Sequence, residues 1–494
     1  MSSVRQDIIH GVSWTAIESF ANTGVGFILG IILARLLTPE DYGTVGMVGI
    51  FISISVIFID GGFGQALIQK QHPTDEDRST VFFFNVGVAI ICYIILFFAA
   101  PWIASFLNTP VLTGILRVLG ISLLVGSVGG VQYNLLSKAI DFRSQAIISI
   151  SGSVLQGIIG VTMAYHGYGP WAIVIPSVFT TTYGVVGVWI VSKWRPKLVF
   201  SKKSFKEMFS FGGNLVVNSL LDTLLGNGTN LLIGKFYTPK QLGYYSKGQS
   251  TANTPASIIN TILGKVMFPV FSKINDDETY LVHVYRRYLR ITSMVIFFFV
   301  VMVAALGRPF TVFLYSSRWL PSVFFMQITC IAVMLGHVNG LNWALIRAHK
   351  RTDIALRKEV IIKTFKFVAL AVAIPFGVVA ICWSVVAGAV FSIIVNTIVT
   401  AKISPYSYKE QISDFVPYIL KAVIVNIPAF FITYLPLPSI VILILGGLVS
   451  CSLYVLLLRM THDENFSTLL GLIPWNKFLP ETLSARIKGQ SQDH

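Results

Sequence analysis

A threonine-proline motif that ends in glycine occurs twice in the chain, at an offset of 200 residues. The first copy, IILARLLTPEDYG, ends at Gly43, and the second, LLIGKFYTPKQLG, ends at Gly243. Polar residues beyond the motif match at the same offset, for example Asp60 with Asn260. A fixed period of this kind indicates a duplicated unit of about 200 residues, so any fold assigned to the chain must contain that unit twice.

Apolar runs of about 20 residues recur along the chain, which is the length that spans a hydrocarbon core of about 30 Å. Of the 494 residues, 54% are hydrophobic and only 12% are charged, whereas soluble domains carry roughly 25% charged residues. The mean hydropathy is +0.73. None of the runs alternates in polarity as the strands of an outer-membrane barrel do. We therefore predict an all-α integral membrane protein with about fourteen transmembrane helices, or about twelve if the last pair is misread.

The predicted spans cover residues 11–37, 42–70, 78–107, 110–138, 143–166, 169–193, 206–237, 240–272, 284–314, 319–347, 354–375, 378–402, 415–436 and 438–460. Most of the 37 lysine and arginine residues lie before the first span or in the connections after even-numbered spans. The positive-inside rule then places both termini in the cytoplasm. We expect the N-terminus to lead into an uncleaved first span. The net charge of +15 does not indicate nucleic-acid binding, because the basic residues sit in short loops rather than on one soluble face.

The two copies of the motif are separated by six spans, so both enter the membrane from the same side. This is a parallel repeat, whose pseudo-two-fold axis lies along the membrane normal. The predicted organisation is an N-terminal six-helix bundle (1–193), a cytoplasmic linker (194–205), a C-terminal six-helix bundle (206–402), two further helices (403–460) and a cytoplasmic tail (461–494).

Polar residues inside the spans concentrate in the duplicated helices. Glu18 and Asn22 lie one turn apart on span 1, and Asn218 and Asp222 have the same spacing on span 7. A charge at mid-bilayer costs about 2.5–3.5 kcal/mol on insertion scales, so such groups face a bundle interior or a wet cavity. We expect spans 1, 2, 7 and 8 to line a central cavity between the halves. The alternative is that these groups only hold the bundle together by hydrogen bonds between helices.

The four cysteines lie far apart in apolar runs and form no C-x-x-C pair, so we interpret them as small hydrophobes in packed helices. Asp75 and Asp77 have the spacing of a sugar-nucleotide metal site, but a helix start explains them and no nucleotide-binding domain accompanies them. The sequence therefore predicts no cofactor, no metal site and no catalytic residue.

Three stretches resemble the polysaccharide-transport, or O-antigen-unit flippase, family of the multidrug/oligosaccharidyl-lipid/polysaccharide exporter superfamily. They are ARLLTPEDYG (34–43), DGGFGQALIQK (60–70) and LGYYSKGQSTANTPASIINTILGKVMFPVFSKI (242–274). The resemblance covers about residues 1–400 and is nearest to exporters of colanic-acid-type and teichuronic-acid-type repeat units.

The resemblance implies a flippase of the bacterial inner membrane, which turns an oligosaccharide on polyprenyl pyrophosphate to the outer leaflet by alternating access. Products of such pathways are O-antigen, capsule or exopolysaccharide. Cavities in the family are often cationic, and H⁺ or Na⁺ is the expected counter-ion. A polysaccharide polymerase and chain-length proteins are the expected partners. No bond is made or broken, so the chain is not expected to be an enzyme.

Roles can be assigned to the polar residues from the repeat and their chemistry. We expect basic groups to meet the anionic head group, namely Arg35, Arg117, Lys235, Lys247 and Lys265. Amides would serve the sugar hydroxyls, namely Gln65, Asn218, Asn253 and Asn260. Glu18, Asp60 or Asp222 would bind the coupling ion.

Three other functions fit a chain of this kind. A drug or cation antiporter of the same superfamily should have an acidic, aromatic cavity, whereas these spans carry as many basic as acidic groups. A membrane-integral polymerase, ligase or glycosyltransferase usually needs a sizeable soluble loop, and the longest interior connections are about a dozen residues. A scaffold for a biosynthetic complex is the third alternative.

Overall fold

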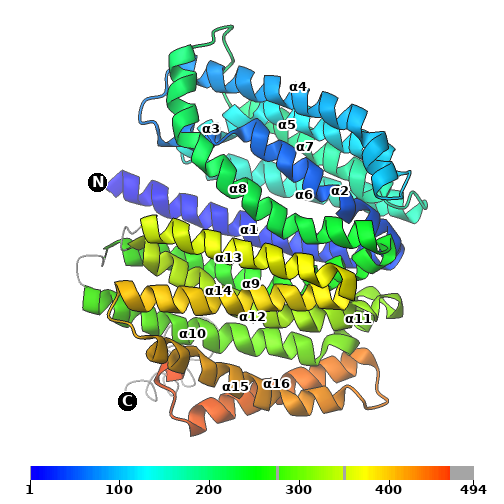
Figure 1. Ribbon diagram of the computed structural model, residues 1–494, viewed down its shortest axis with the longest axis vertical. Helices are drawn as coiled ribbons and strands as arrows, with labels where there is room; N and C mark the ends of the chain where they lie inside the picture. Colours follow the sequence, from blue (N-terminus) through cyan, green and yellow to red (C-terminus); the bar gives the residue numbers. More distant parts are fainter. Residues whose placement is uncertain (1, 274–277, 349–351, 468–494) are drawn as a thin grey trace. The chain divides into compact units, whose positions relative to one another are not determined.

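The computed structural model describes residues 2–273, 278–348 and 352–467. These residues form helices and connections, without a strand (Figure 1). The long helices are α1 (Ser2–Leu36), α2 (Pro39–Asp60), α4 (Asp75–Phe106), α5 (Leu112–Lys138), α6 (Phe142–Tyr165), α7 (Trp171–Val191), α8 (Lys202–Phe236), α9 (Pro239–Lys273), α10 (Glu278–Ala305), α12 (Ser322–Ala348), α13 (Thr352–Ala373), α14 (Val378–Ile403), α15 (Tyr408–Ile432) and α16 (Ser439–Met460). The short ones are α3 (Phe63–Gln69), α11 (Gly307–Tyr315), η1 (Ser317–Trp319) and η2 (Ile374–Phe376).

The prediction of an all-α membrane protein is confirmed. Among the described residues, eleven helices are long and apolar enough to cross a membrane. A long helix lies in each of the fourteen predicted spans, but α8, α9 and α13 are not among the eleven. This count covers only the described residues, so the exact number of spans stays a prediction.

The chain divides into two compact units, Met1–Lys247 and Gly248–His494. The dividing point lies within α9, so the first unit contains α8 and the first turns of α9. The predicted halves 1–193 and 206–402, with their linker and tail, therefore stay a prediction.

Threonine caps set the helix starts in the first unit. The Thr38 side chain accepts from the Asp41 amide while the Asp41 carboxylate accepts from Thr38, and Pro39 occupies the first turn. Thr238 repeats the arrangement with Gln241 in place of the acid. Such capping boxes satisfy the amides that a helix start leaves without partners.

The two motif copies meet in the first unit. A Cβ placed on Gly43 would lie 2.6 Å from the carbonyl carbon of Pro239, and one on Gly243 would lie 2.6 Å from that of Pro39. The starts of α2 and α9 therefore cross backbone against backbone, and only glycine permits this approach. The motif that repeats in the sequence is in contact with its own copy.

The predicted span 42–70 is not one helix. It breaks at Gly61 and Gly62, whose φ angles of 55° and 74° lie in the left-handed region that favours glycine. α3 begins after this break, and Gly62 packs on the backbone of Gly212 of α8. The predicted span 284–314 is likewise divided, because α10 ends at Ala305 and α11 starts at Gly307.

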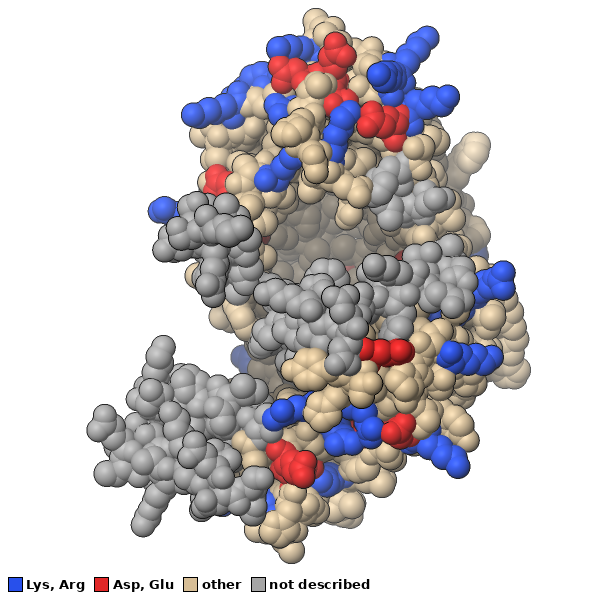
Figure 2. Space-filling view, turned by 90° about the vertical axis from the view of Figure 1, so that its left-hand side faces the viewer, with Lys and Arg blue, Asp and Glu red and all other residues tan. Residues whose placement is uncertain are grey.

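Ion pairs gather at the end of the first unit that carries α3 and the start of α4. The ammonium of Lys70 lies 3.1 Å from carboxylate oxygens of both Asp77 and Glu207, which joins α3, α4 and α8. Lys197 pairs with Asp75 at 2.6 Å. Figure 2 shows lysine and arginine side chains gathered with acidic ones at this end, at the top of the view.

The second unit is built around α10, which packs on α12 and α15. Tyr285 and Phe297 of α10 are fully buried in its core. The carboxylate of Asp414, 1% exposed, accepts hydrogen bonds from Arg286 and Arg290 at 2.5–2.8 Å and from the Tyr406 hydroxyl at 2.7 Å. A buried carboxylate needs such partners, because an unpaired charge out of water is costly.

Candidate functional site

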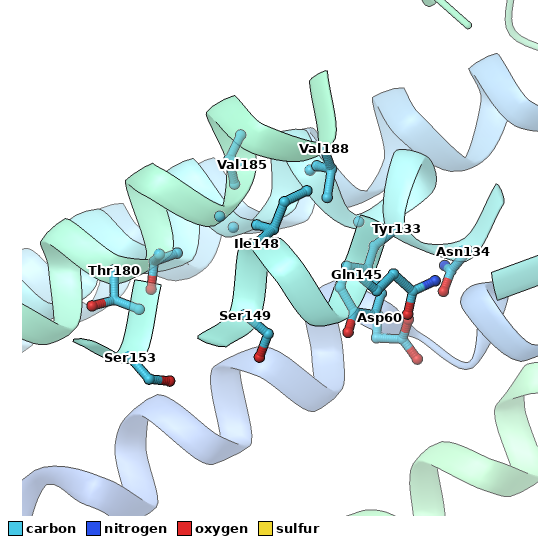
Figure 3. A pocket seen from close by; sticks show the side chains of 15 residues that line it. Asp60, Tyr133, Asn134, Gln145, Ile148, Ser149, Ser153, Thr180, Val185 and Val188 are labelled. Carbon is cyan, nitrogen blue, oxygen red and sulfur yellow. The ribbon is translucent and has the colours of Figure 1, made fainter. Parts of the chain in front are cut away.

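A cavity of about 410 Å³ lies inside the first unit, between α2, α5, α6 and α7. Glycines of α5 and α7 form part of its wall. At Gly129 a Cβ would come within 2.8 Å of the Val185 side chain, so the small residue lets α5 and α7 pack closely. Polar side chains from all four helices line the space (Figure 3): Asp60, Tyr133, Asn134, Gln145, Ser149, Ser153, Thr180 and Thr181.

Asp60 ends α2 and serves the start of α3. Its carboxylate lies close to the backbone amides of Gly62 and Gly64 and interacts with them electrostatically. These are amides that the first turn of a helix leaves without partners, so Asp60 acts as the cap that Gly62 cannot provide. Figure 3 shows the carboxylate beside Asn134 and Gln145, at one end of the cavity. The predicted ion-coupling residue Asp60 is thus both a cavity residue and the cap of a broken helix.

Polar residues of α1 reach the wall that α6 forms. The Asn22 amide donates to the Ser149 hydroxyl at 2.7 Å and accepts from the Ser153 hydroxyl at 2.8 Å. Glu18, one turn earlier on the same helix, is close enough to Tyr133 to interact with it electrostatically. The structure therefore brings Glu18 and Asp60 to one polar region of the first unit.

The basic residues predicted to bind substrate lie elsewhere in this unit. The Lys247 side chain is buried, and its ammonium donates to the carbonyl of Gly30 at 3.0 Å and lies 5.2 Å from the centre of the Tyr42 ring. It thus joins α9 to α1 and to the first turn of α2. A buried ammonium can be retained only with acceptors or an aromatic face around it.

Arg117 and Lys235 are held against α4. The Arg117 guanidinium lies 4.2 Å from the ring of Phe97 and donates to its carbonyl at 3.3 Å. The Lys235 ammonium donates at 2.6 Å to the carbonyl of Phe106, at the end of α4, and lies 4.1 Å from that ring. Arg35 is exposed near the end of α1. None of these residues lines the 410 Å³ cavity.

The remaining predicted residues are exposed where the structure describes them: Gln65 on α3, Asn218 and Asp222 on α8, and Asn253 on α9. Asn253 donates to the Gln249 carbonyl of its own helix at 2.9 Å. The side chains of Asn260 and Lys265 lie outside the described residues. Exposed amides and a carboxylate thus lie along α8 and α9.

Sequence reasoning missed a buried lysine in the second unit. Lys358 of α13 is 2% exposed, and its ammonium donates to the Asn396 side chain at 2.6 Å and lies 4.3 Å from the Trp343 ring. Asn396 in turn donates to Asn339 at 2.9 Å. Lys358 stands beside a short connection rich in basic residues, which is why the sequence suggests an inner loop. The isolated asparagines of spans 10 and 12 were the signal for a buried partner.

No group of three His, Cys, Asp or Glu side chains that could hold a metal ion occurs within the described parts of the chain. The four cysteines are free thiols: Cys330 and Cys382 are buried, Cys92 is partly exposed and Cys451 is exposed. The polar regions of both units are built instead from single carboxylates, amides, hydroxyls and ammonium groups.

Residues 32–324 match the sequence family described as polysaccharide biosynthesis protein. The chain belongs to this family. Among its relatives, the teichuronic acid biosynthesis protein TuaB of Bacillus subtilis is 25% identical and covers 86% of this chain and 88% of its own length. The lipopolysaccharide biosynthesis protein WzxC of Escherichia coli K12 is 26% identical, covering 87% and 88%. The succinoglycan biosynthesis transport protein ExoT of Rhizobium meliloti is 23% identical, covering 69% and 72%.

Solved structures show the fold of this family member. The lipid II flippase MurJ in an inward closed conformation superposes with a TM-score of 0.73, over 92% of this chain and 100% of that one, at 13% identity. An inward-facing multidrug resistance transporter of the MATE family and the MOP superfamily gives 0.57, over 77% and 95%, at 13% identity. The predicted exporter fold is confirmed.

Proposed function

We propose that this polysaccharide biosynthesis protein is a flippase for oligosaccharide repeat units linked to polyprenyl pyrophosphate. The observation that carries the proposal is the MurJ-like fold over nearly the whole chain, joined to family membership. Relatives named for the biosynthesis of teichuronic acid and lipopolysaccharide, and for succinoglycan transport, support a polysaccharide substrate. Location in the bacterial inner membrane, with both termini in the cytoplasm, is part of the proposal.

The physical task is to carry a sugar and a pyrophosphate past hydrocarbon that would not solvate them. Exposed polar groups on α8 and α9, including Asn218, Asp222 and Asn253, supply hydrogen-bond partners in place of water. Groups of this kind in a membrane protein face protein or a water-filled path, because lipid would leave them unsatisfied. The polyprenyl tail stays in lipid while the head group passes.

Lys247 is the basic residue with the strongest case for meeting the anionic head group. It is held between two helices of the duplicated set and beside the first turn of α2. An ammonium that already has a backbone carbonyl as its acceptor can exchange it for a phosphate oxygen, which forms a stronger, charge-assisted hydrogen bond. Arg117 and Lys235 carry the same possibility at the α4 side, and Arg35 lies exposed near the end of α1.

Asp60 is the leading ion-coupling group. Protonation of the Asp60 carboxylate, or its binding of Na⁺, would weaken its interaction with the amides of Gly62 and Gly64 at the start of α3. The break between α2 and α3 would then loosen, so the charge state of one cavity residue would set the angle between two helices. Glu18 shares the polar region, and Asp222 is the third candidate on α8. The ion itself, H⁺ or Na⁺, and coupling to a polymerase or chain-length protein belong to the proposal.

The test is transport of a lipid-linked oligosaccharide with a shortened polyprenyl chain in proteoliposomes, measured as access of added lectin or glycosidase to the sugar. We expect translocation that speeds up under an imposed pH or Na⁺ gradient. Asp60→Asn should remove the dependence on the gradient, whereas Glu76→Gln, an exposed acid in the first turn of α4, should retain it. Lys247→Gln should weaken transport at low substrate concentration most.

The competing functions give different outcomes in the same vesicles. Dye or drug efflux without sugar movement would identify a drug–cation antiporter. New glycosidic bonds in the recovered lipid would identify a polymerase or glycosyltransferase. Translocation that ignores every gradient would retain the flippase but remove Asp60 and ion coupling from the proposal.

A further inference from the structure

The segment between α7 and α8 carries an exposed apolar tip on a basic stretch. Residues 193–206 contain six lysines or arginines and no acid. In their midst the linker tip, defined here as Leu198, Val199 and Phe200, is exposed to 94%, 41% and 53%. Three consecutive exposed apolar side chains on a polar loop are unusual and mark a contact with something apolar.

The linker tip is held in place rather than loosely attached. The backbone amides of Lys197 and Ser201 donate to the hydroxyls of Ser79 and Thr80 of α4, at 3.1 and 2.9 Å. The Lys197 ammonium pairs with Asp75 at 2.6 Å. Between these anchors the Val199 amide donates to the Lys197 carbonyl at 2.7 Å, which closes a tight turn with Leu198 at its apex.

The linker starts directly after α7, which ends at Val191 and is long and apolar enough to cross a membrane, so we place its start at the level of a membrane interface. Arg195 donates to the carbonyls of Trp189 and Ser192 at the end of α7, and its guanidinium lies 5.1 Å from the Trp189 ring. Arginine at the end of a spanning helix is typical of the boundary between lipid and water. Figure 1 shows the linker as an arc at the rim of the first unit, beside the start of α8 and standing out sideways from the long helices. An element that projects sideways at this level lies over lipid.

We propose that the linker tip inserts into the head-group region of a membrane leaflet and that the surrounding cations recruit anionic phospholipid there. Lys193, Lys202, Lys203 and Lys206 are exposed around the tip. An apolar wedge within a basic cluster is the chemistry that anionic lipid surfaces bind, with the apolar part about 5–10 Å into the head-group and acyl boundary. The inference does not depend on the flippase function or on which leaflet the linker faces.

The test is electron paramagnetic resonance on the full chain with a nitroxide at position 198. Cys92, Cys330, Cys382 and Cys451 are first replaced by alanine, and Leu198→Cys is compared with Glu76→Cys, an exposed site at the same end of the unit. Because position 198 is almost fully exposed, the substitution should not disturb folding. Accessibility to oxygen and to a water-soluble nickel complex, calibrated with spin-labelled lipids, gives the depth of each label.

In vesicles containing phosphatidylglycerol, we expect the label at 198 about 5–10 Å below the phosphate plane and the label at 76 in water. The depth should decrease in vesicles of phosphatidylcholine alone, and also in phosphatidylglycerol after Lys202→Gln, Lys203→Gln and Lys206→Gln together. Equal nickel accessibility at 198 and 76 would overturn the insertion. Equal depth in both lipids would overturn the role of anionic lipid, and a label shielded from both reagents would show a protein contact instead.

Discussion

Substitution of Gly43 or Gly243 tests the packing of the protein most directly, because the two copies of its repeated motif are in contact at these residues. Gly43→Ala adds one methyl group at a site where the carbonyl carbon of Pro239 is 2.6 Å away. Ordinary van der Waals contacts begin at 3.4 Å, so the two backbones must part by at least about 0.8 Å. The obstacle is backbone, which cannot rotate away as the end of a side chain can.

The size of the effect follows from a comparison with Gly49→Ala on the same helix, where a Cβ meets nothing within 4 Å. Both substitutions favour the helix by about 0.5–1 kcal/mol, because glycine is the more flexible residue in the unfolded chain. Only Gly43→Ala adds overpacking, which costs about 1–3 kcal/mol. The difference between the two variants in unfolding free energy should therefore be about 1–3 kcal/mol, or roughly five- to 150-fold in the folded-to-unfolded ratio.

The assay is unfolding in mild detergent with added dodecyl sulfate, followed by tryptophan fluorescence. Gly243→Ala should behave like Gly43→Ala, since it faces the Pro39 backbone in the same way. The double variant should cost less than the sum of the two, because backbones already parted by one methyl accommodate the second. Equal midpoints for Gly43→Ala and Gly49→Ala, or strict additivity in the double variant, would refute the close crossing.

Three further predictions concern ion pairs and caps. Asp414→Asn should lower the unfolding free energy by about 3–5 kcal/mol, because it removes the negative charge that the arginine partners of this buried site pair with. Glu410→Gln, at a site whose side chain is 41% exposed, should lower it by under about 1 kcal/mol. Burial alone would raise the pKa of Asp463, but the hydrogen bond and charge of Lys421 outweigh burial and hold that pKa below its usual range. The ionised Asp463 therefore stabilises the fold at neutral pH, and this contribution is lost as the pH falls below about 4. The unfolding free energy of Asp463→Asn should accordingly depend less steeply on pH across that window. Lys138 donates to the carbonyls of Leu67, Ile68 and Lys70 at the end of α3, so Lys138→Met should speed amide hydrogen exchange in residues 63–70 and leave α7 unchanged.

Hydropathy and helix punctuation predict the positions of the long helices well, since span length and threonine caps are local properties. Thr38, Thr74 and Ser407 all form capping boxes where helices start. The break at Gly61 and Gly62 was less visible, because glycine in an apolar span also serves close packing. Its cause is the positive φ at both residues together with the Gly212 backbone beside them. A contact between residues 150 positions apart cannot be inferred from the local sequence around either of them.

The candidate site was predictable in its charged members and not in its neutral ones. Glu18 and Asp60 are conspicuous because carboxylates are rare in spans. Ser149 and Gln145 are not, since serines and glutamines occur in spans for many reasons, and only the fold places them beside Asn22 and Asp60. Arg117 and Lys235 show the converse: their charge attracts attention, but aromatic rings and carbonyls at α4 already engage them.

The approach of Gly62 to Gly212 has a mechanical consequence. The two main chains are in direct contact, with no side chain between them. No change of rotamer can therefore absorb a displacement, and a tilt of one helix must displace the other. Any rotation of α8 must therefore also move the break between α2 and α3.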